Sequence, residues 1–115
     1  MNNPIVDKSF RFAVKIVGLA RNIRDRKEFE LASQILRSGT SIGANVAESQ
    51  RAQSNKDFLS KMYIAAKEAN ETEYWLRLLH ETNIITATEF QDVYNDVKEI
   101  IRILMSITKT SRNNL

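Results

Sequence analysis

Four successive stretches of this chain carry apolar residues at alternating steps of three and four, the spacing that places them on one face of an α-helix. In the clearest stretch the steps run unbroken from Phe58 to Leu79. A chain built from strands would alternate every second residue and would need many turn-forming residues. The 115 residues contain only three glycines and one proline. The sequence therefore predicts an all-α fold.

Local signals set the ends of the four predicted helices. Ser54 and Thr86 each stand three residues before an acidic residue, a pattern typical of a helix N-terminus. Asp25 and Glu28 have the same spacing and resemble a further capping pair. The apolar pattern is lost in residues 108–115, which we expect to be frayed. The predicted helices cover residues 4–25, 28–52, 55–81 and 87–109.

Helices of this length, joined by connections of a few residues, predict an antiparallel up-down-up-down four-helix bundle. Its length suits one domain, residues 1–115. Gly39 and Gly43 are unfavourable inside a helix, yet the apolar phase of the second helix passes through them unbroken. We therefore expect a continuous helix. Together with Ala47, the two glycines form a row of small residues that lets another helix approach closely.

A bundle needs one apolar stripe per helix, and this chain has more. The additional apolar residues are Leu31, Leu36, Ala44, Leu59, Tyr63, Ala66, Tyr74, Trp75, Ile101 and Ile103. One interpretation is a wide core face, since bundle helices often bury three positions per heptad. The other is a second apolar surface that contacts another subunit. The residues alone leave both open.

The composition removes most of the chemistry that a helical bundle can carry. The absence of cysteine excludes disulfides, thiolate metal sites and cysteine nucleophiles. The single histidine, His80, excludes sites that need two imidazoles, and Arg77 occupies the position of the glutamate in a Glu-x-x-His di-iron motif. The segment from Gly39 to Gly43 lacks the pattern of a phosphate-binding loop. We expect no enzymatic activity, catalytic residue, metal, cofactor or small-molecule substrate.

A group of acidic residues stands out in the third predicted helix. They are Glu68, Glu71 and Glu73 in the third predicted helix, with Glu48 in the second. They can form a solvated or salt-bridged surface, or they can pair with Arg37 or Arg77 across a helix interface. Metal binding or acid–base use is a third interpretation. Trp75 beside Tyr74 favours packing in the core or at an interface over stacking on a nucleic-acid base.

The net charge of +3 is concentrated in the first half of the chain. Residues 1–57 hold ten basic and six acidic residues, and the remainder is slightly acidic. The basic residues can be solvated cations, some of them complementing the C-terminal end of the first helix. They can also form a phosphate-binding patch for RNA or DNA, which oligomerisation would multiply. The candidates for that patch are Arg11, Lys15, Arg21, Arg24, Arg26, Lys27 and Arg51.

Nothing in the sequence favours a membrane location. No run of 18 or more apolar residues is present, so no membrane-spanning helix is expected. The first ten residues carry a charge pair, Asp7 and Lys8, where a signal peptide would be apolar. We therefore expect a cytoplasmic protein.

The segment RSGTSIGANVAESQ, from Arg37 to Gln50, resembles the signature of the 23S rRNA-intervening sequence protein family. The family pattern S-I-x-x-N-[IV]-A-E is met by Ser41, Ile42, Asn45, Val46, Ala47 and Glu48. Two further family elements are met by Arg51, Ser54, Lys56 and Phe58, and by Ile64, Ala65, Glu68, Glu71 and Leu76. The chain departs from the pattern at Ser49 and Gln50, where many members have glycine and an aromatic residue. The resemblance covers residues 9–108.

This resemblance implies a four-helix bundle without enzymatic activity that assembles into a ring, typically a homopentamer. The family name comes from genes inside insertions of rRNA genes and does not imply ribosome binding. A related branch, the accessory variability determinant of diversity-generating retroelements, is more basic and contacts a reverse transcriptase and nucleic acid. We expect Asn45 and Glu48 to be partly buried and hydrogen-bonded near a subunit seam. The interface candidates are Arg37, Ser41, Asn45, Glu48, Glu68, Glu71 and Trp75.

Overall fold

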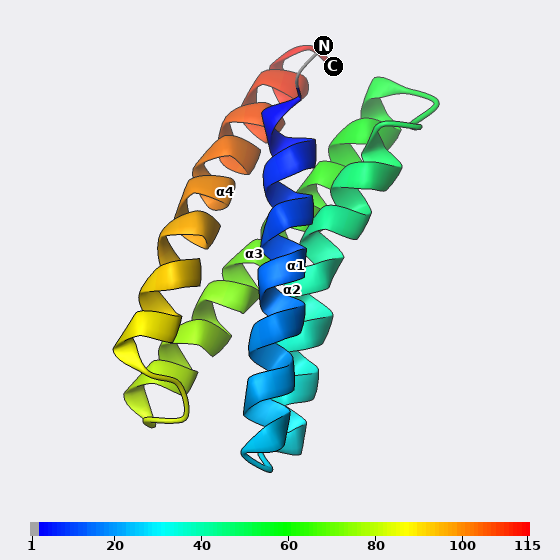
Figure 1. The fold of residues 1–115 in the computed structure, drawn as a ribbon. Helices are drawn as coiled ribbons and strands as arrows, with labels where there is room; N and C mark the ends of the chain where they lie inside the picture. Colours follow the sequence, from blue (N-terminus) through cyan, green and yellow to red (C-terminus); the bar gives the residue numbers. More distant parts are fainter. Residues whose placement is uncertain (1–2) are drawn as a thin grey trace.

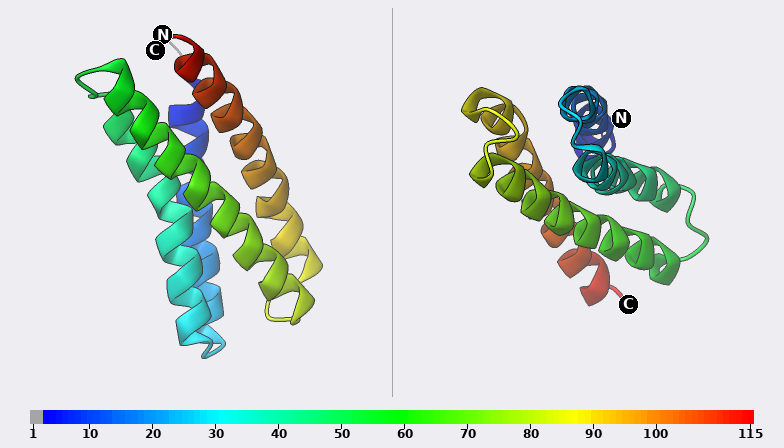
Figure 2. Two further views of the ribbon diagram at one scale, coloured as in Figure 1. Left: turned by 180° about the vertical axis from the view of Figure 1, so that it is seen from behind. Right: turned by 90° about the horizontal axis from the view of Figure 1, so that it is seen from below.

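The computed structural model describes residues 3–115, which form four α-helices and no strand. The helices are α1 (Pro4–Asp25), α2 (Phe29–Ser49), α3 (Asn55–Glu81) and α4 (Ala87–Asn113). Consecutive helices run antiparallel and pack against each other, and α4 returns against α1 (Figure 1). The α1–α2 hairpin is inclined to the α3–α4 hairpin (Figure 2). The prediction of an all-α fold with four helices is confirmed.

The predicted apolar stripes meet in one buried cluster that contains side chains from all four helices. Phe12, Ile42, Leu76 and Leu104 are among its fully buried members. These contacts remove large apolar areas from water and are the main source of stability in a domain of this size. The stripes therefore account for the arrangement of the helices.

One stripe is only partly buried at its first position. Phe58 was expected in the core, but it is only half-buried, whereas the next residue, Leu59, is buried. The opening turn of α3 packs against the last turns of α4, as the hydrogen bonds between Asn55 and Ser111 show. Phe58 lies beside Ile107 and Ser111 of α4 and packs against the edge of the core cluster.

Two of the predicted helix starts are confirmed. The Ser54 hydroxyl accepts a hydrogen bond of 3.0 Å from the backbone N–H of Asp57. Thr86 and Glu89 form a complete capping box, in which each side chain accepts a hydrogen bond from the backbone N–H of the other residue. These bonds satisfy N–H groups that have no partner inside the helix.

The predicted capping pair of Asp25 and Glu28 is wrong. Helix α1 continues through Asp25, and Lys27 turns the chain with a left-handed φ of 67°. Glu28 is the cap residue of α2 and makes no capping bond with its side chain. Helix α2 also ends at Ser49, before the predicted end at residue 52.

The predicted fraying from residue 108 onward is also wrong, because α4 continues to Asn113. Thr108 and Ser111 are buried in its last turns. The Ser111 hydroxyl donates to Oδ1 of Asn55 at 2.9 Å, and the Asn55 amide donates to the Ser111 carbonyl at 3.1 Å. The end of α4 is thus held against the start of α3 by polar contacts rather than by apolar contacts.

Helix α2 is continuous through its glycines, as predicted. A Cβ atom built on Gly39 would lie 2.7 Å from Cγ2 of Ile16, and one on Gly43 would lie 3.1 Å from the Ser9 carbonyl oxygen. Both distances are shorter than ordinary contacts, so only glycine lets α1 lie this close. The predicted close approach is confirmed, and the approaching helix is α1 of the same chain. Ala47, the third member of the row, is exposed.

Candidate assembly and nucleic-acid surfaces

Arg37 on α2 joins the signature segment to the acidic residues of α3. Its guanidinium donates to Oε2 of Glu68 at 3.3 Å and also bonds Oε2 of Glu71. The indole N–H of Trp75 donates to the same Glu71 oxygen at 3.0 Å. Gln34 accepts two further bonds from Arg37. Of the interpretations left open by the sequence, the structure displays the pairing with Arg37, in a network at the α2–α3 seam.

The other signature residues bond within their own helix or stay exposed. The Ser41 hydroxyl donates to the Arg37 carbonyl at 2.7 Å, and the Asn45 amide donates to the Ser41 carbonyl at 2.9 Å. Asn45 is half-buried, in line with the expectation. Glu48 is not: its side chain is 63% exposed and lies 3.5 Å from Lys61 of α3. The expected burial of Glu48 is wrong for the single chain, because Glu48 lies at the outer edge of α2, where its carboxylate stays hydrated.

The aromatic and imidazole rings are engaged in packing. Trp75 is half-buried against the core, and its ring meets that of Tyr74 edge to face at 5.2 Å. His80 stacks on Phe90 at 4.3 Å in the last turn of α3, where a histidine complements the negative end of the helix. Phe90 stacks in turn on Tyr94. Packing accounts for both Trp75 and His80.

Three of the seven basic candidates are paired with carboxylates. Arg11 bonds Asp7 one turn earlier on the surface of α1. The Lys15 ammonium lies 2.8 Å from Asp96 and 3.3 Å from Asp92, both on α4. These hydrogen bonds raise the pKa of Lys15. The third, Arg26, joins the α1–α2 connection to the start of α4.

Arg26 makes the most complete ion pair of the three. Its guanidinium donates hydrogen bonds to both carboxylate oxygens of Glu89, at 3.0 and 2.8 Å. It also donates to the Ile84 carbonyl at 2.7 Å. The hydrogen bond from Arg26, together with that from the backbone N–H of Thr86, lowers the pKa of Glu89 from 4.5 to about 2. Charge-assisted, bidentate hydrogen bonds of this kind are stronger than hydrogen bonds between neutral groups. Arg26 therefore links the α1–α2 connection to the start of α4.

The remaining four candidates form no ion pair within residues 3–115; they are Arg21, Arg24, Lys27 and Arg51. Arg24 lies over the ring of Phe29, 5.9 Å from its centre. Arg51 belongs to the α2–α3 connection, at the opposite end of the molecule from the α1–α2 connection (Figure 1). The seven cations therefore do not form one patch. What remains together is Arg21, Arg24 and Lys27.

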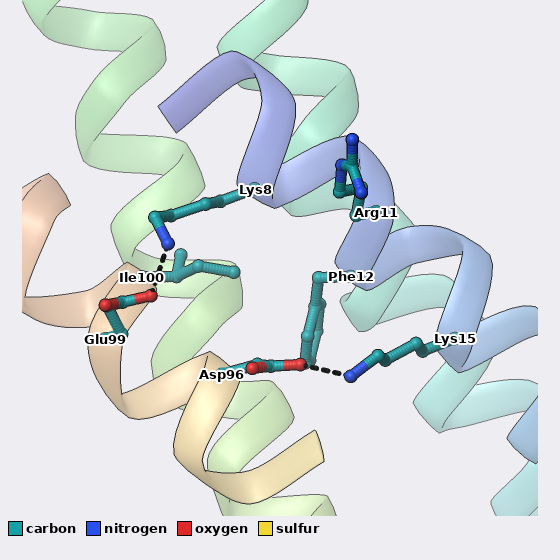
Figure 3. Close-up of a pocket in the computed structure, with 7 residues that line it drawn as sticks. All are labelled: Lys8, Arg11, Phe12, Lys15, Asp96, Glu99 and Ile100. Carbon is teal, nitrogen blue, oxygen red and sulfur yellow. Dashed lines mark hydrogen bonds and ion pairs between the residues drawn. The ribbon is translucent and has the colours of Figure 1, made fainter. Parts of the chain in front are cut away.

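A pocket of about 250 Å³ opens along the seam between α1 and α4 (Figure 3). Its charged lining residues are Lys8, Arg11, Lys15, Asp96 and Glu99, and its floor is Phe12 and Ile100. Lys8 lies 2.7 Å from Glu99, and this hydrogen bond raises the pKa of Lys8 and lowers that of Glu99. Both lysines of the pocket point at carboxylates of α4 (Figure 3). The charges of the pocket thus bridge two helices.

The outward face of α1 and α2 carries exposed apolar side chains beside Arg21 and Arg24. Phe10 and Val14 of α1 are 67% and 58% exposed, and Leu36 of α2 is 39% exposed. Only three of the 21 residues of α2 are charged, whereas α4 carries eight charges in 27 residues. A groove of about 380 Å³ follows this face; its lining residues are Val17, Ala20, Arg21, Arg24, Ala32, Ser33 and Leu36.

Helix α3 carries a second exposed apolar set. Ile64 and Tyr74 are 40% and 59% exposed, and Tyr63 is exposed as well. The sequence had singled out Tyr63, Tyr74 and Leu36 as apolar residues outside the main stripes. It missed Phe10 and Val14. Their signal was a spacing of four residues on the side of the first helix away from its stripe.

Residues 3–115 contain neither a cluster of metal ligands nor a membrane-spanning helix. No group of three or more histidine, aspartate or glutamate side chains there could hold a metal ion. None of the helices is both long and apolar enough to cross a membrane.

The fold and the α2–α3 network define a small all-α protein of four helices. The model of the 23S rRNA-intervening sequence protein family matches residues 1–106, and the chain belongs to this family. A crystal structure of a protein of unknown function from the S23 ribosomal protein family of Bacteroides thetaiotaomicron VPI-5482 is similar, with 53% sequence identity and a TM-score of 0.88. The match covers 91% of this chain and 98% of that one. No curated protein matches the chain.

Proposed function

We propose that this protein is a non-enzymatic subunit of a homo-oligomer, an antiparallel four-helix bundle that assembles into a homopentameric ring. The observation that carries the proposal is the apolar outward face of α1 and α2. Phe10 and Val14 of α1 and Leu36 of α2 are exposed, and only three of the 21 residues of α2 are charged. Contiguous exposed apolar surface marks interaction sites on soluble proteins, and depletion of charge marks the centre of an interface.

The fourth helix supplies the contrast within the same molecule. Its exposed residues include Gln91, Asn95, Lys98, Arg102 and Lys109, a surface typical of a helix that faces water. Helix α4 thus presents a polar surface to solvent, whereas the outward face of α1 and α2 exposes large apolar side chains. Self-association covers the second side and leaves the first exposed.

The placement of the polar groups supports a non-enzymatic role. Glu68 and Glu71 are held by Arg37, and the imidazole of His80 is stacked on Phe90. A general acid or base needs a titratable group within reach of a substrate. Here these groups are used to join helices.

Light scattering or sedimentation equilibrium at micromolar concentration tests the assembly. We expect a mass of about five times the 13.2 kDa of one chain. A species of 13.2 kDa would contradict the proposed function. A stable oligomer of another number would retain the assembly and correct the ring to that number.

A second candidate function is binding of RNA or DNA, as an accessory protein that also contacts a reverse transcriptase. Its support is the group Arg21, Arg24 and Lys27, whose charges no carboxylate within residues 3–115 neutralises. Copies arranged in a ring would present this group several times, and affinity for phosphates rises with their number. Binding of a structured RNA across a salt series tests it. Affinity that falls steeply with salt is expected, and no binding at low ionic strength would remove the candidate.

A further inference from the structure

We propose that the groove between α3 and α4 binds a single strand of RNA. Exposed cations of α4 hold the phosphates of the strand, and one of its bases lies against the ring of Tyr63. This inference rests on the second candidate function, the binding of nucleic acid. It places the binding site on a surface other than that of Arg21, Arg24 and Lys27.

Helix α4 carries four acidic and four basic residues, and the two signs lie on different sides of the helix. All four carboxylates pair with cations of α1 or of the connection that follows it; the pairs are Glu99 with Lys8, Asp92 and Asp96 with Lys15, and Glu89 with Arg26. The basic residues follow one another at steps of four, seven and three, which places them together on the side toward α3; they are Lys98, Arg102, Lys109 and Arg112. The carboxylates of α4 are thus neutralised within the chain.

Three of these four cations have no carboxylate partner among the described residues. Lys98 lies 3.0 Å from Glu73 of α3. Arg102, Lys109 and Arg112 are exposed and form no ion pair within residues 3–115. From Arg102 to Arg112 the row rises by ten residues, or about 15 Å. A row of cations, in contrast to a single one, suits a chain of phosphates.

A groove of about 540 Å³ lies beside this row, between α3 and α4. Its lining includes Tyr63 and Asn70 of α3, and Met105, Lys109 and Arg112 of α4, and none of its lining residues is acidic. The pocket between α1 and α4 differs, because carboxylates in its lining already pair with its lysines. An anion in the α3–α4 groove therefore meets cations without a competing carboxylate in the lining.

The apolar part of the groove suits a nucleic-acid base. Tyr63 and Met105 are both exposed where they line it. Proteins that bind single strands combine a positively charged groove, which follows the backbone, with aromatic rings on which bases stack. A duplex keeps its bases stacked on one another and offers mainly its backbone to such a groove. The exposed ring therefore favours a single strand over a duplex.

Two polar residues of the groove favour RNA over DNA. Asn70 and Ser106 line the groove and are exposed. Their amide and hydroxyl groups can form hydrogen bonds with the 2′-hydroxyl of ribose, the group by which a protein distinguishes RNA from DNA. The lining thus offers groups for the phosphates, the base and the sugar of an RNA strand.

The experiment measures the affinity of the full chain for a short labelled oligouridine by fluorescence anisotropy over a salt series. We expect the double variant Lys109→Gln with Arg112→Gln to weaken binding about tenfold or more. It should also reduce the slope of log affinity against log salt by about 1.4, since each neutralised phosphate of a single strand contributes about 0.7. The matched control is Arg21→Gln with Arg24→Gln, which removes the same charge from α1 and should leave affinity and slope close to those of the wild type.

A second pair of variants tests the base. Tyr63→Leu should weaken binding by about fivefold or more through lost stacking. The salt slope should stay unchanged, because stacking releases no counterions. Tyr63→Phe retains the ring and should bind like the wild type. Oligodeoxyuridine should bind the wild type more weakly than oligouridine, and circular dichroism checks that every variant retains its helices.

The outcomes separate this inference from the candidate function on which it rests. A wild type that binds neither oligouridine nor a structured RNA at low ionic strength would overturn both. The inference alone would be overturned if only the structured RNA bound, if the control pair weakened binding as much as the α4 pair, or if Tyr63→Leu kept wild-type affinity. Equal competition by poly-glutamate would overturn it in favour of an acidic protein partner, and equal affinity for oligodeoxyuridine would overturn the choice of RNA.

Discussion

Helix α1 has two neighbours, and it is held to them in different ways. Against α2 its backbone lies close, over Gly39 and Gly43, with Ile16 filling the contact. Against α4 the contact is bridged by long side chains, in pairs such as Lys15 with Asp96 and Arg26 with Glu89. A pocket remains along this second seam (Figure 3).

This contrast between the two seams indicates which contacts of α1 stabilise the fold. Close apolar packing removes surface from water and depends little on pH or salt. Ion pairs near the surface contribute little each, and salt screens them. We expect the α1–α2 seam to carry most of the free energy that holds α1. The α1–α4 seam should contribute a smaller part that responds to pH and to salt.

The largest effect should come from Ile16→Ala. Ile16 is fully buried against Gly39, so the substitution loses apolar burial and leaves a cavity. Such changes cost about 2–5 kcal/mol in the free energy of unfolding, measurable by urea denaturation. The control is Met105→Ala on the exposed side of α4, where we expect a change within about 0.5 kcal/mol. Equal losses in the two variants would contradict the assignment of the seam.

The second effect should come from Gly39→Ala. The new methyl group would meet Ile16 at 2.7 Å, and that branched side chain is fully enclosed. We expect a loss of about 1–3 kcal/mol from overpacking, despite the better helix propensity of alanine. Gly18→Ala is the matched control: nothing lies within 4 Å of its added Cβ, so it should gain up to about 1 kcal/mol.

A double-variant cycle sharpens this second prediction. In the Ile16→Ala background the atoms that meet the new methyl group are gone, so Gly39→Ala should cost less than in the wild type. An unchanged cost would show that the strain lies elsewhere than at Ile16. Residues in direct contact show coupling energies of about 0.5–3 kcal/mol in such cycles.

The helices were predictable from the sequence because their apolar spacing and two of their caps are local signals. The errors occurred where a distant partner decides the outcome. The end of α4 is ordered because Ser111 bonds Asn55, a residue 56 positions away. Phe58 is only half-buried, and it lies beside Ile107 and Ser111 at the distant end of α4. No local pattern records these contacts.

The candidate surfaces were predictable only in part. The sequence placed Arg37 among the possible partners of the α3 carboxylates, and the structure selects it. It could not show that Lys15 faces Asp92 and Asp96, about 80 positions away, and so it counted Lys15 as free for nucleic acid. Whether a cation is available depends on tertiary pairing.

The third effect is pH dependence at the α1–α4 seam. The pKa of Glu89 is lowered to about 2 from 4.5, chiefly by Arg26, so its ionised form stabilises the folded chain. This stability is fully present above pH 4.5 and is lost as the pH falls toward 2. Glu89→Gln keeps a residue suited to the capping box and removes the charge. We expect wild type to exceed this variant by about 1–2 kcal/mol at pH 7, after screening, and the excess to vanish near pH 2. An excess that is constant with pH would contradict the role of the charge.

The smallest effect should come from Lys15→Met. Methionine retains most of the apolar stem of lysine and removes the ammonium group that bonds Asp92 and Asp96. These partners are partly exposed, so the pair should contribute less than about 1 kcal/mol at low salt. The difference between variant and wild type should shrink further in 1 M NaCl, where the screening length is about 3 Å. Thermal unfolding at two salt concentrations measures it. If the free energy of unfolding fell by several kcal/mol and the loss persisted at high salt, the two seams of α1 would contribute equally to stability. That result would contradict the contrast between packing and ion pairing.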